Sequence, residues 1–137
     1  MELLQTAASS LPTETRYIVR PHPTCKINPT NYPALPCEIS SSPLEELLEN
    51  SDVAFTSNIT SAAIDSYCFG IPVISVLDGN AFNMSPLRSI KNIVYFTSTD
   101  ELTTALSNIR QHQRKLGKPY FCLDKKLPIW RNLLDLY

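Results

Sequence analysis

The chain has little glycine, few histidines and no long apolar run. It contains 3 glycines and 2 histidines among 137 residues. No segment approaches the roughly 20 consecutive apolar residues that a membrane-spanning helix needs. No GxGxxG pattern follows any predicted strand, so the fingerprint of dinucleotide-binding domains is missing and neither NAD nor FAD is expected as a cofactor.

An excess of charge of either sign is also missing. The formal net charge is -1, which gives no electrostatic reason to expect nucleic acid or an anionic membrane as a partner. The N-terminal stretch MELLQTAASSLPTETRY has no basic segment followed by a long apolar core, so it is not typical of a secretory signal. We therefore expect a cytoplasmic protein that contacts the inner face of the membrane peripherally at most.

The 4 cysteines are scattered, at Cys25, Cys37, Cys68 and Cys122. No CxxC pair and no Cys/His pair at ligand spacing occurs, so no metal site is expected. Reduced thiols are the default for such a protein. Cys68 lies on a predicted helix among apolar residues and is expected to be a small core residue.

The order of strand-like and helix-like segments predicts the fold class. Strands are predicted at 16–20, 37–39, 53–56, 73–77 and 93–96, and helices at 2–10, 42–50, 60–69, 98–114 and 127–137. VISVL at 73–77 and the run at 93–96 are continuous apolar strands, which are typical of strands buried on both faces. Many of the 11 prolines crowd between Pro21 and Pro43, a region we expect to be irregular.

Local patterns predict the helix ends. SPLE from Ser42 to Glu45 and the pair Ser98 and Glu101 are capping boxes. The amphipathic tail LPIWRNLLDLY is expected to pack back as a closing helix. Alternating strands and helices indicate βαβ units. We therefore predict a Rossmann-like three-layer α/β/α domain, with a parallel sheet of four or five strands, that spans residues 1–137 as the C-terminal part of a longer protein.

A hydroxyl-rich turn follows the third predicted strand. The residues SNITS run from Ser57 to Ser61 and lie at the mouth of a predicted helix. Free backbone N–H groups at such a point, with the hydroxyls of Ser57, Thr60 and Ser61, favour a phosphate. The alternative is that Asn58 or Thr60 only caps its own helix.

A proline-stiffened histidine follows the first predicted strand, in the sequence YIVRPHP. His22 lies between two prolines, so its ring is held at a small entropic cost and could stabilise charge on a departing phosphate. Arg20 and Pro23 belong to the same predicted ligand loop. The alternatives are a loop-packing histidine and an arginine that only pairs with a neighbouring carboxylate.

Asp65, one turn into the helix after the hydroxyl turn, could bind a ribose or could tie down the loop of His22. No residue qualifies as a general base, because no carboxylate pair or Ser/His/Asp arrangement is evident. The sequence therefore predicts a domain that binds an activated donor and does not catalyse transfer alone.

In their order and spacing, these motifs resemble the C-terminal, donor-binding half of GT-B fold glycosyltransferases that make bacterial surface polysaccharides. Sialyltransferase-like, Kdo-transferase-like and glycerophosphotransferase-like proteins show the closest likeness, which covers residues 16–110. The matching residues are His22 and Pro23, Ser51 and Asp52, Thr60 and Ser61, and Gly70, Pro72, Val73 and Ile74.

The resemblance implies a nucleotide-sugar donor, with CMP or CDP as the favoured nucleotide. It implies that the loop of His22 contacts the nucleotide and that Thr60 and Ser61 hold its phosphate. The catalytic base and the acceptor site would belong to an N-terminal lobe, and no metal or other cofactor is implied. Asn58 and Ile59 depart from some relatives, which leaves the particular donor open.

Two other functions fit the sequence. One is a lobe of a nucleotide-sugar epimerase with the same two-lobed architecture. The other is a non-catalytic assembly or regulatory module, for which the tail residues Trp130, Leu133, Leu134 and Tyr137 would form a partner surface.

Overall fold

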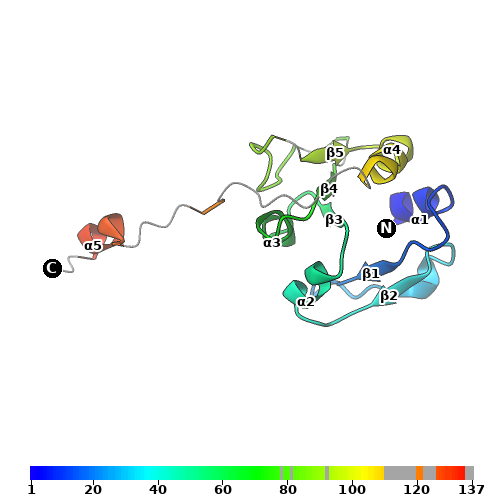
Figure 1. The fold of residues 1–137 in the computed structure, drawn as a ribbon, viewed down its shortest axis with the longest axis horizontal. Coiled ribbons are helices and arrows are strands. Elements are labelled where there is room, and N and C mark those ends of the chain that lie inside the picture. The colour runs from blue at the N-terminus through cyan, green and yellow to red at the C-terminus, as the bar shows by residue number, and fades with distance from the viewer. Residues whose placement is uncertain (78, 81, 92, 110–119, 122–125, 135–137) are drawn as a thin grey trace.

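The computed structural model describes residues 1–77, 79, 80, 82–91, 93–109, 120, 121 and 126–134. Helices and short strands alternate along most of the chain, but β5 follows β4 with no helix between them among the described residues (Figure 1). The strands are β1 (Tyr17–Val19), β2 (Cys37–Ile39), β3 (Ala54–Ser57), β4 (Val73–Val76) and β5 (Val94–Phe96). The helices are α1 (Glu2–Ala8), the 3-10 helix η1 (Pro29–Asn31), α2 (Leu44–Glu49), α3 (Ala62–Cys68), α4 (Thr99–Ile109) and α5 (Pro128–Leu133).

The strands form two parallel sheets. In one, β1 pairs with β2, and in the other the order is β3-β4-β5. All three pairings are parallel, with Ile18 opposite Glu38, Phe55 opposite Ile74, and Ser75 opposite Tyr95. The α/β class and the parallel pairing are confirmed, but the expected single sheet of four or five strands is wrong.

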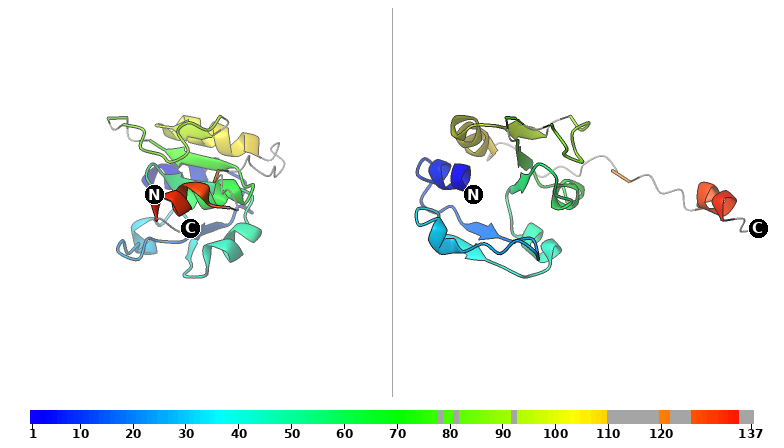
Figure 2. Two further views of the ribbon diagram at one scale, coloured as in Figure 1. Left: turned by 90° about the vertical axis from the view of Figure 1, so that its left-hand side faces the viewer. Right: turned by 180° about the vertical axis from the view of Figure 1, so that it is seen from behind.

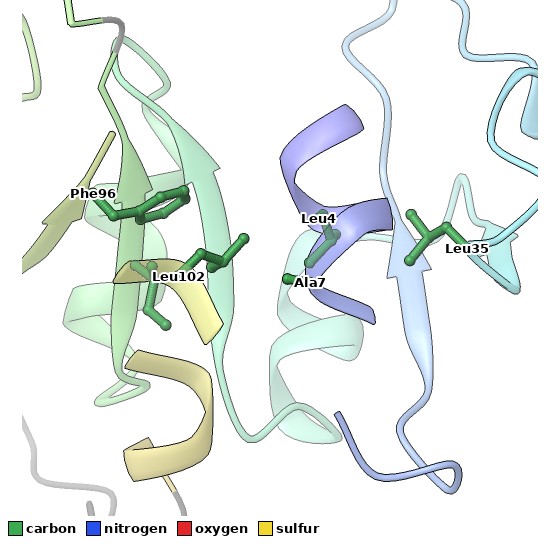
Figure 3. Close-up of a cluster of buried hydrophobic side chains, with 6 residues drawn as sticks. Leu4, Ala7, Leu35, Phe96 and Leu102 are labelled. Atoms are coloured by element: carbon green, nitrogen blue, oxygen red, sulfur yellow. The ribbon is translucent and has the colours of Figure 1, made fainter. Parts of the chain in front are cut away.

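Helix α1 lies between the two sheets. Leu4 and Ala7 of α1 are buried in one cluster with Leu35 beside the two-stranded sheet and with Phe96 and Leu102 of the other half. Figure 3 shows α1 between these two groups of side chains. Helix α1 also packs along α4. The N-terminal helix therefore fills the space in which β1 would have to approach β3.

The central strand β4 is buried as the apolar run VISVL predicts. Val73, Ile74 and Ser75 are buried between β3 and β5. The same prediction is wrong for β5, where Val94 is exposed because this strand is the edge of its sheet. A strand at the edge has one neighbour, so its burial depends on the helices that cover it.

Helix α3 packs on β3 and β4 and forms a second buried cluster. Ala63 of α3, Val73 of β4 and Leu87 make up this cluster, with Tyr120 packed against it. Cys68 is exposed, so its predicted core position is wrong. The buried side of α3 follows Ala63 and Ser66, and Cys68 falls outside that stripe of helical spacing.

The two predicted capping boxes have different outcomes. At α4 the Ser98 Oγ accepts a bond from the Glu101 N–H at 3.3 Å, and Glu101 Oε2 accepts from the Ser98 N–H at 3.3 Å, which confirms the box. At α2 the N-cap is Pro43, which is extended and has no side-chain cap, so the SPLE box is wrong. The predicted continuation of α4 over 110–114 lies outside the described residues.

The C-terminal helix α5 is present, but its predicted packing is wrong. Every described residue from 126 to 134 is exposed, and Trp130 is 60% exposed. In Figures 1 and 2 this helix stands apart from the body that the two sheets form. Within the described residues, no helix has the length and apolar character to cross a membrane.

Candidate functional site

The turn after β3 is held by buried hydroxyls of the strand pair. The Thr56 hydroxyl donates to Ser75 Oγ at 3.3 Å, and the Ser75 hydroxyl donates to the carbonyl of Ser57, also at 3.3 Å. Thr56 and Ser75 are buried, so these bonds form in a poorly solvated setting. They fix the point at which the chain leaves the sheet and enters the turn Ser57 to Ser61.

Of the three hydroxyls of that turn, only the hydroxyl of Thr60 takes part in a hydrogen bond to another described residue. Helix α3 begins at Ala62, and its N-cap Ser61 makes no side-chain capping bond. Instead Thr60 Oγ1 accepts from the Ala62 N–H at 3.3 Å, a long bond. Ser57 and Ser61 are exposed, and no hydrogen bond joins either side-chain hydroxyl to another described residue. Two donors of this turn are therefore free for a ligand.

Asn58 does not cap α3 but joins two loops. Its Nδ2 donates to the carbonyl of Phe82 at 2.9 Å, which ties the turn after β3 to the loop after β4. This bond also fixes the orientation of the amide. The other amide atom, Asn58 Oδ1, is buried and accepts no hydrogen bond from the described residues. A buried acceptor without a donor costs about 1–3 kcal/mol.

The joined loops carry three exposed apolar side chains that we did not predict as site residues. Ile59 lies in the turn after β3, and Phe82 and Met84 lie in the loop after β4. Phe82 is 89% exposed. The signal in the sequence was available, because an aromatic residue in the turn-rich stretch DGNAFNMSP has no strand or helix to bury it.

The loop after β1 is a tight local turn. The carbonyl of His22 accepts from the Cys25 N–H at 2.8 Å, and the Thr24 N–H donates to His22 Nδ1 at 3.3 Å. Thr24 Oγ1 is 2.8 Å from the same nitrogen. Because Nδ1 acts as an acceptor, the neutral ring carries its proton on Nε2. His22 and Pro23 are exposed, so this N–H donor is available to a ligand.

Arg20 and Arg88 lie in the loops that follow β1 and β4. Arg20 Nε donates to the carbonyl of Ser42 at 3.1 Å, which links the chain beyond β1 to the chain beyond β2. Arg88 Nη1 donates to the carbonyl of Ser85 at 3.3 Å. Neither guanidinium pairs with a described carboxylate. Both are exposed and keep N–H donors for an anion.

Asp65 is exposed on α3 and makes no side-chain hydrogen bond to a described residue. It therefore does not tie down the His22 loop among the described residues, which was one of its two expected roles. No hydrogen bond or ion pair between described residues links the His22 loop to the turn Ser57 to Ser61. The two predicted halves of the site remain on separate sheets.

Two cavities of the molecule lie away from the predicted site residues. A cavity of about 720 Å³ is lined by Thr15 and Arg16 before β1, by Asp52 and Val53 before β3, and by the end of α4. Another, of about 600 Å³, lies between β4, β5 and α4. None of the seven predicted site residues lines either cavity. The larger of these two cavities lies toward the amino ends of β1 and β3.

Comparison with protein-family models, curated proteins and solved structures finds no match for this chain.

The chemistry at the carboxyl ends of the strands is therefore deduced from the side chains alone. The free groups are hydrogen-bond donors: the hydroxyls of Ser57 and Ser61, the N–H of His22 and the guanidinium of Arg20. Together with exposed apolar side chains, donors of this kind suit an anionic ligand that also has an apolar or aromatic part. Within the described residues, no group of three or more His, Cys, Asp or Glu side chains is placed to hold a metal ion.

Proposed function

We propose that this chain is the donor-binding lobe of a GT-B fold glycosyltransferase of bacterial surface carbohydrate biosynthesis. The ligand is a nucleotide-sugar, with CMP or CDP as the favoured nucleotide. One observation supports the proposal most strongly. The turn after β3 is fixed by buried hydroxyl bonds, yet it leaves Ser57 and Ser61 exposed with unused donors. The start of α3 is already served by Thr60, whose Oγ1 accepts from the Ala62 N–H, so the hydroxyls of Ser57 and Ser61 remain available to a ligand.

The proposed mechanism assigns one task to each loop. The turn Ser57 to Ser61 holds a phosphate by its hydroxyls and by backbone N–H groups. His22 Nε2–H and Arg20 follow a strand of the other sheet, so they are proposed to donate to the departing phosphate only when the bound donor bridges the two loops, where negative charge develops in the transition state. Asp65 hydrogen-bonds the ribose. The lobe that completes the site supplies the acceptor and the general base, because no described residue here fits that role.

The exposure of these donors is consistent with half of a site between two lobes. A nucleotide bound to one lobe leaves part of its surface in water, so the chain by itself binds weakly. The lobe is proposed to work in the cytoplasm, with peripheral contact at the inner face of the membrane at most. It needs no cofactor in this mechanism.

The proposal is tested by calorimetric titration of the chain with CMP, CDP, UDP and GDP. We expect millimolar-range binding, with the cytidine nucleotides preferred. Hydrogen bonds to charged groups are worth about 1.5–3 kcal/mol each, and about 1.4 kcal/mol is tenfold in affinity, so the double variant Ser57→Ala/Ser61→Ala should bind CDP at least about a hundredfold more weakly and show no saturation in the millimolar range. The matched control is Ser107→Ala, which removes an exposed hydroxyl from α4. Equal affinities of the double variant and the control would refute the assigned turn.

A second function, as a non-catalytic assembly module, is favoured by α5. Its apolar residues Ile129, Trp130 and Leu133 are all exposed, although a closing helix would bury them. Sedimentation of the full-length protein with and without Trp130→Ala/Leu133→Ala tests this function. A smaller assembly for the variant, together with no nucleotide binding by the parent, would favour the module over the donor lobe.

A further inference from the structure

Three apolar side chains stand exposed on the two loops that Asn58 joins: Ile59, Phe82 and Met84. From this arrangement we infer that the Phe82 ring is the platform on which the base of the bound nucleotide stacks, with Ile59 and Met84 at its margins. The inference rests on the proposed donor site and adds to it the residue that holds the heterocycle.

The position of Phe82 is set by a side-chain bond. The bond of 2.9 Å from Asn58 Nδ2 to the Phe82 carbonyl places this residue directly against the turn Ser57 to Ser61. Phe82 and the free hydroxyls therefore lie on two loops that this hydrogen bond joins, beyond the carboxyl ends of β3 and β4. A nucleotide carries its phosphate and its base at the two ends of one ribose. The joined loops thus carry donors for one end and an exposed aromatic side chain for the other.

Exposure of the ring serves no purpose in folding. Phe82 is 89% exposed, so it contributes almost nothing to the core, and water covers a large apolar area. The backbone that carries it is nevertheless held by Asn58. An exposed aromatic ring on a loop whose backbone is held in place favours a ligand with an aromatic face of its own.

A nucleobase suits the ring better than the sugar does. Every base has a π-face, and stacking on an aromatic side chain is independent of base identity to a first approximation. Phe82 offers no hydrogen-bonding group, so it supplies affinity without choosing between cytosine, uracil and guanine. Selection of the base would then depend on polar groups nearby. Removing the ring should therefore weaken all nucleotides by a similar factor.

The test compares a ligand that has a base with one that lacks it. CDP and ribose 5-phosphate are titrated into the chain, into Phe82→Ala and into Phe82→Tyr, which keeps an aromatic face. Stacking is worth roughly 1–3 kcal/mol per base, so Phe82→Ala should lose about tenfold in CDP affinity, while ribose 5-phosphate binding stays unchanged. Phe82→Tyr should retain CDP binding. Trp130→Ala is the matched control, because it removes an exposed aromatic ring from α5.

A spectroscopic measurement separates stacking from a structural effect. In a Phe82→Trp/Trp130→Phe variant, the single indole reports from the platform position. Its fluorescence should be quenched by CDP in a saturable way and should not respond to ribose 5-phosphate.

Three results would overturn the inference. Unchanged CDP affinity in Phe82→Ala would remove Phe82 from the site but leave the proposed donor function intact. Equal losses for CDP and ribose 5-phosphate would show that the residue shapes the loop and does not hold the base. If the parent chain binds neither ligand, the donor function itself fails, and the inference fails with it.

Discussion

The two sheets of this molecule bury their strands to very different extents. In the three-stranded sheet, Val73, Ile74 and Ser75 of β4 are buried and Phe96 of β5 is 1% exposed. In the two-stranded sheet no residue of β1 or β2 is buried, and Ile39 is 39% exposed. The strands of the three-stranded sheet are covered by helices, α3 over β3 and β4 and α4 over β5. A pair of three-residue strands depends on what packs over it, which here is α1 with Leu35.

This difference carries over to the candidate site. The turn with the free hydroxyls follows β3 and is fixed by bonds that reach into the buried sheet. The His22 loop follows β1 and is fixed by a turn within itself. The part of the site that is proposed to bind phosphate is therefore held in place by the core. The part assigned to the departing phosphate is stiffened locally, by two prolines and by the bond to Thr24.

The largest effect expected is at Phe96. Truncation of a buried phenylalanine costs about 3–5 kcal/mol, so Phe96→Ala should lower the free energy of unfolding by this amount in urea titrations. Ile39→Ala is the matched truncation in the two-stranded sheet and should cost less than about 1 kcal/mol, because the side chain is partly solvated. Similar losses in the free energy of unfolding for the two variants would contradict the stated difference in burial between the two sheets.

A smaller effect is expected at Leu4, where α1 connects the two halves. Leu4 is buried in the cluster that includes residues of both halves, so Leu4→Ala should cost about 2–3 kcal/mol. Helix α1 holds the halves together, so the variant should also separate their unfolding into two steps, seen as different midpoints for far-ultraviolet dichroism and tyrosine fluorescence. Leu133→Ala on exposed α5 is the leucine control. If Leu4→Ala lowered the stability but both signals still changed in one step with a common midpoint, this result would contradict the role of α1.

The smallest effect concerns the start of α4. Bonds from the backbone N–H and the hydroxyl of Thr97 lower the pKa of the Glu101 carboxyl below its ordinary value. A lowered pKa in the folded state adds stability above the ordinary glutamate pKa, and this stability is lost as the pH falls through the folded-state value. Glu101→Gln should therefore be less stable than the parent at neutral pH and equal to it in acid.

Urea titrations of the parent and Glu101→Gln at the two pH values measure this effect. Asp100→Asn is the control for charge, because Asp100 lies in the same helical turn without a hydrogen bond to a described residue. A difference between parent and Glu101→Gln that persisted unchanged in acid would show that the hydrogen-bonded carboxylate is not its source.

Much of the secondary structure could be predicted because it depends on neighbours in the chain. The apolar run at 73–77 and the glycine and proline beyond α3 are sufficient to place β4 and its preceding helix. The assignment of strands to sheets could not be predicted in this way. It depends on α1, and nothing in the pattern of Leu4 and Ala7 says that they lie between two sheets. The prediction for Cys68 was wrong because it relied on the residue type and its apolar neighbours. Burial on α3 depends instead on which side of the helix a residue occupies.

For the candidate site, the sequence predicted which loops follow the strands, but it did not predict the contacts that these loops make. Ser57 and Ser61 are exposed on the predicted turn, and His22 is exposed on the predicted loop. The role of Asn58 could not be predicted, because its partner Phe82 is brought near only by the pairing of β3 with β4. The predicted meeting of the two loops in one sheet edge also depended on a single sheet, which the chain does not form.

The central claim, that the carboxyl ends of the strands bind the nucleotide, is tested most directly by amide chemical shifts. The chain, labelled with nitrogen-15, would be titrated with CDP. The account predicts saturable shifts at Ser57 to Ser61, Phe82 and His22, with no change at Arg16 or Asp52 in the cavity at the amino ends of the strands. Shifts confined to that cavity, or none at all at millimolar CDP, would contradict it.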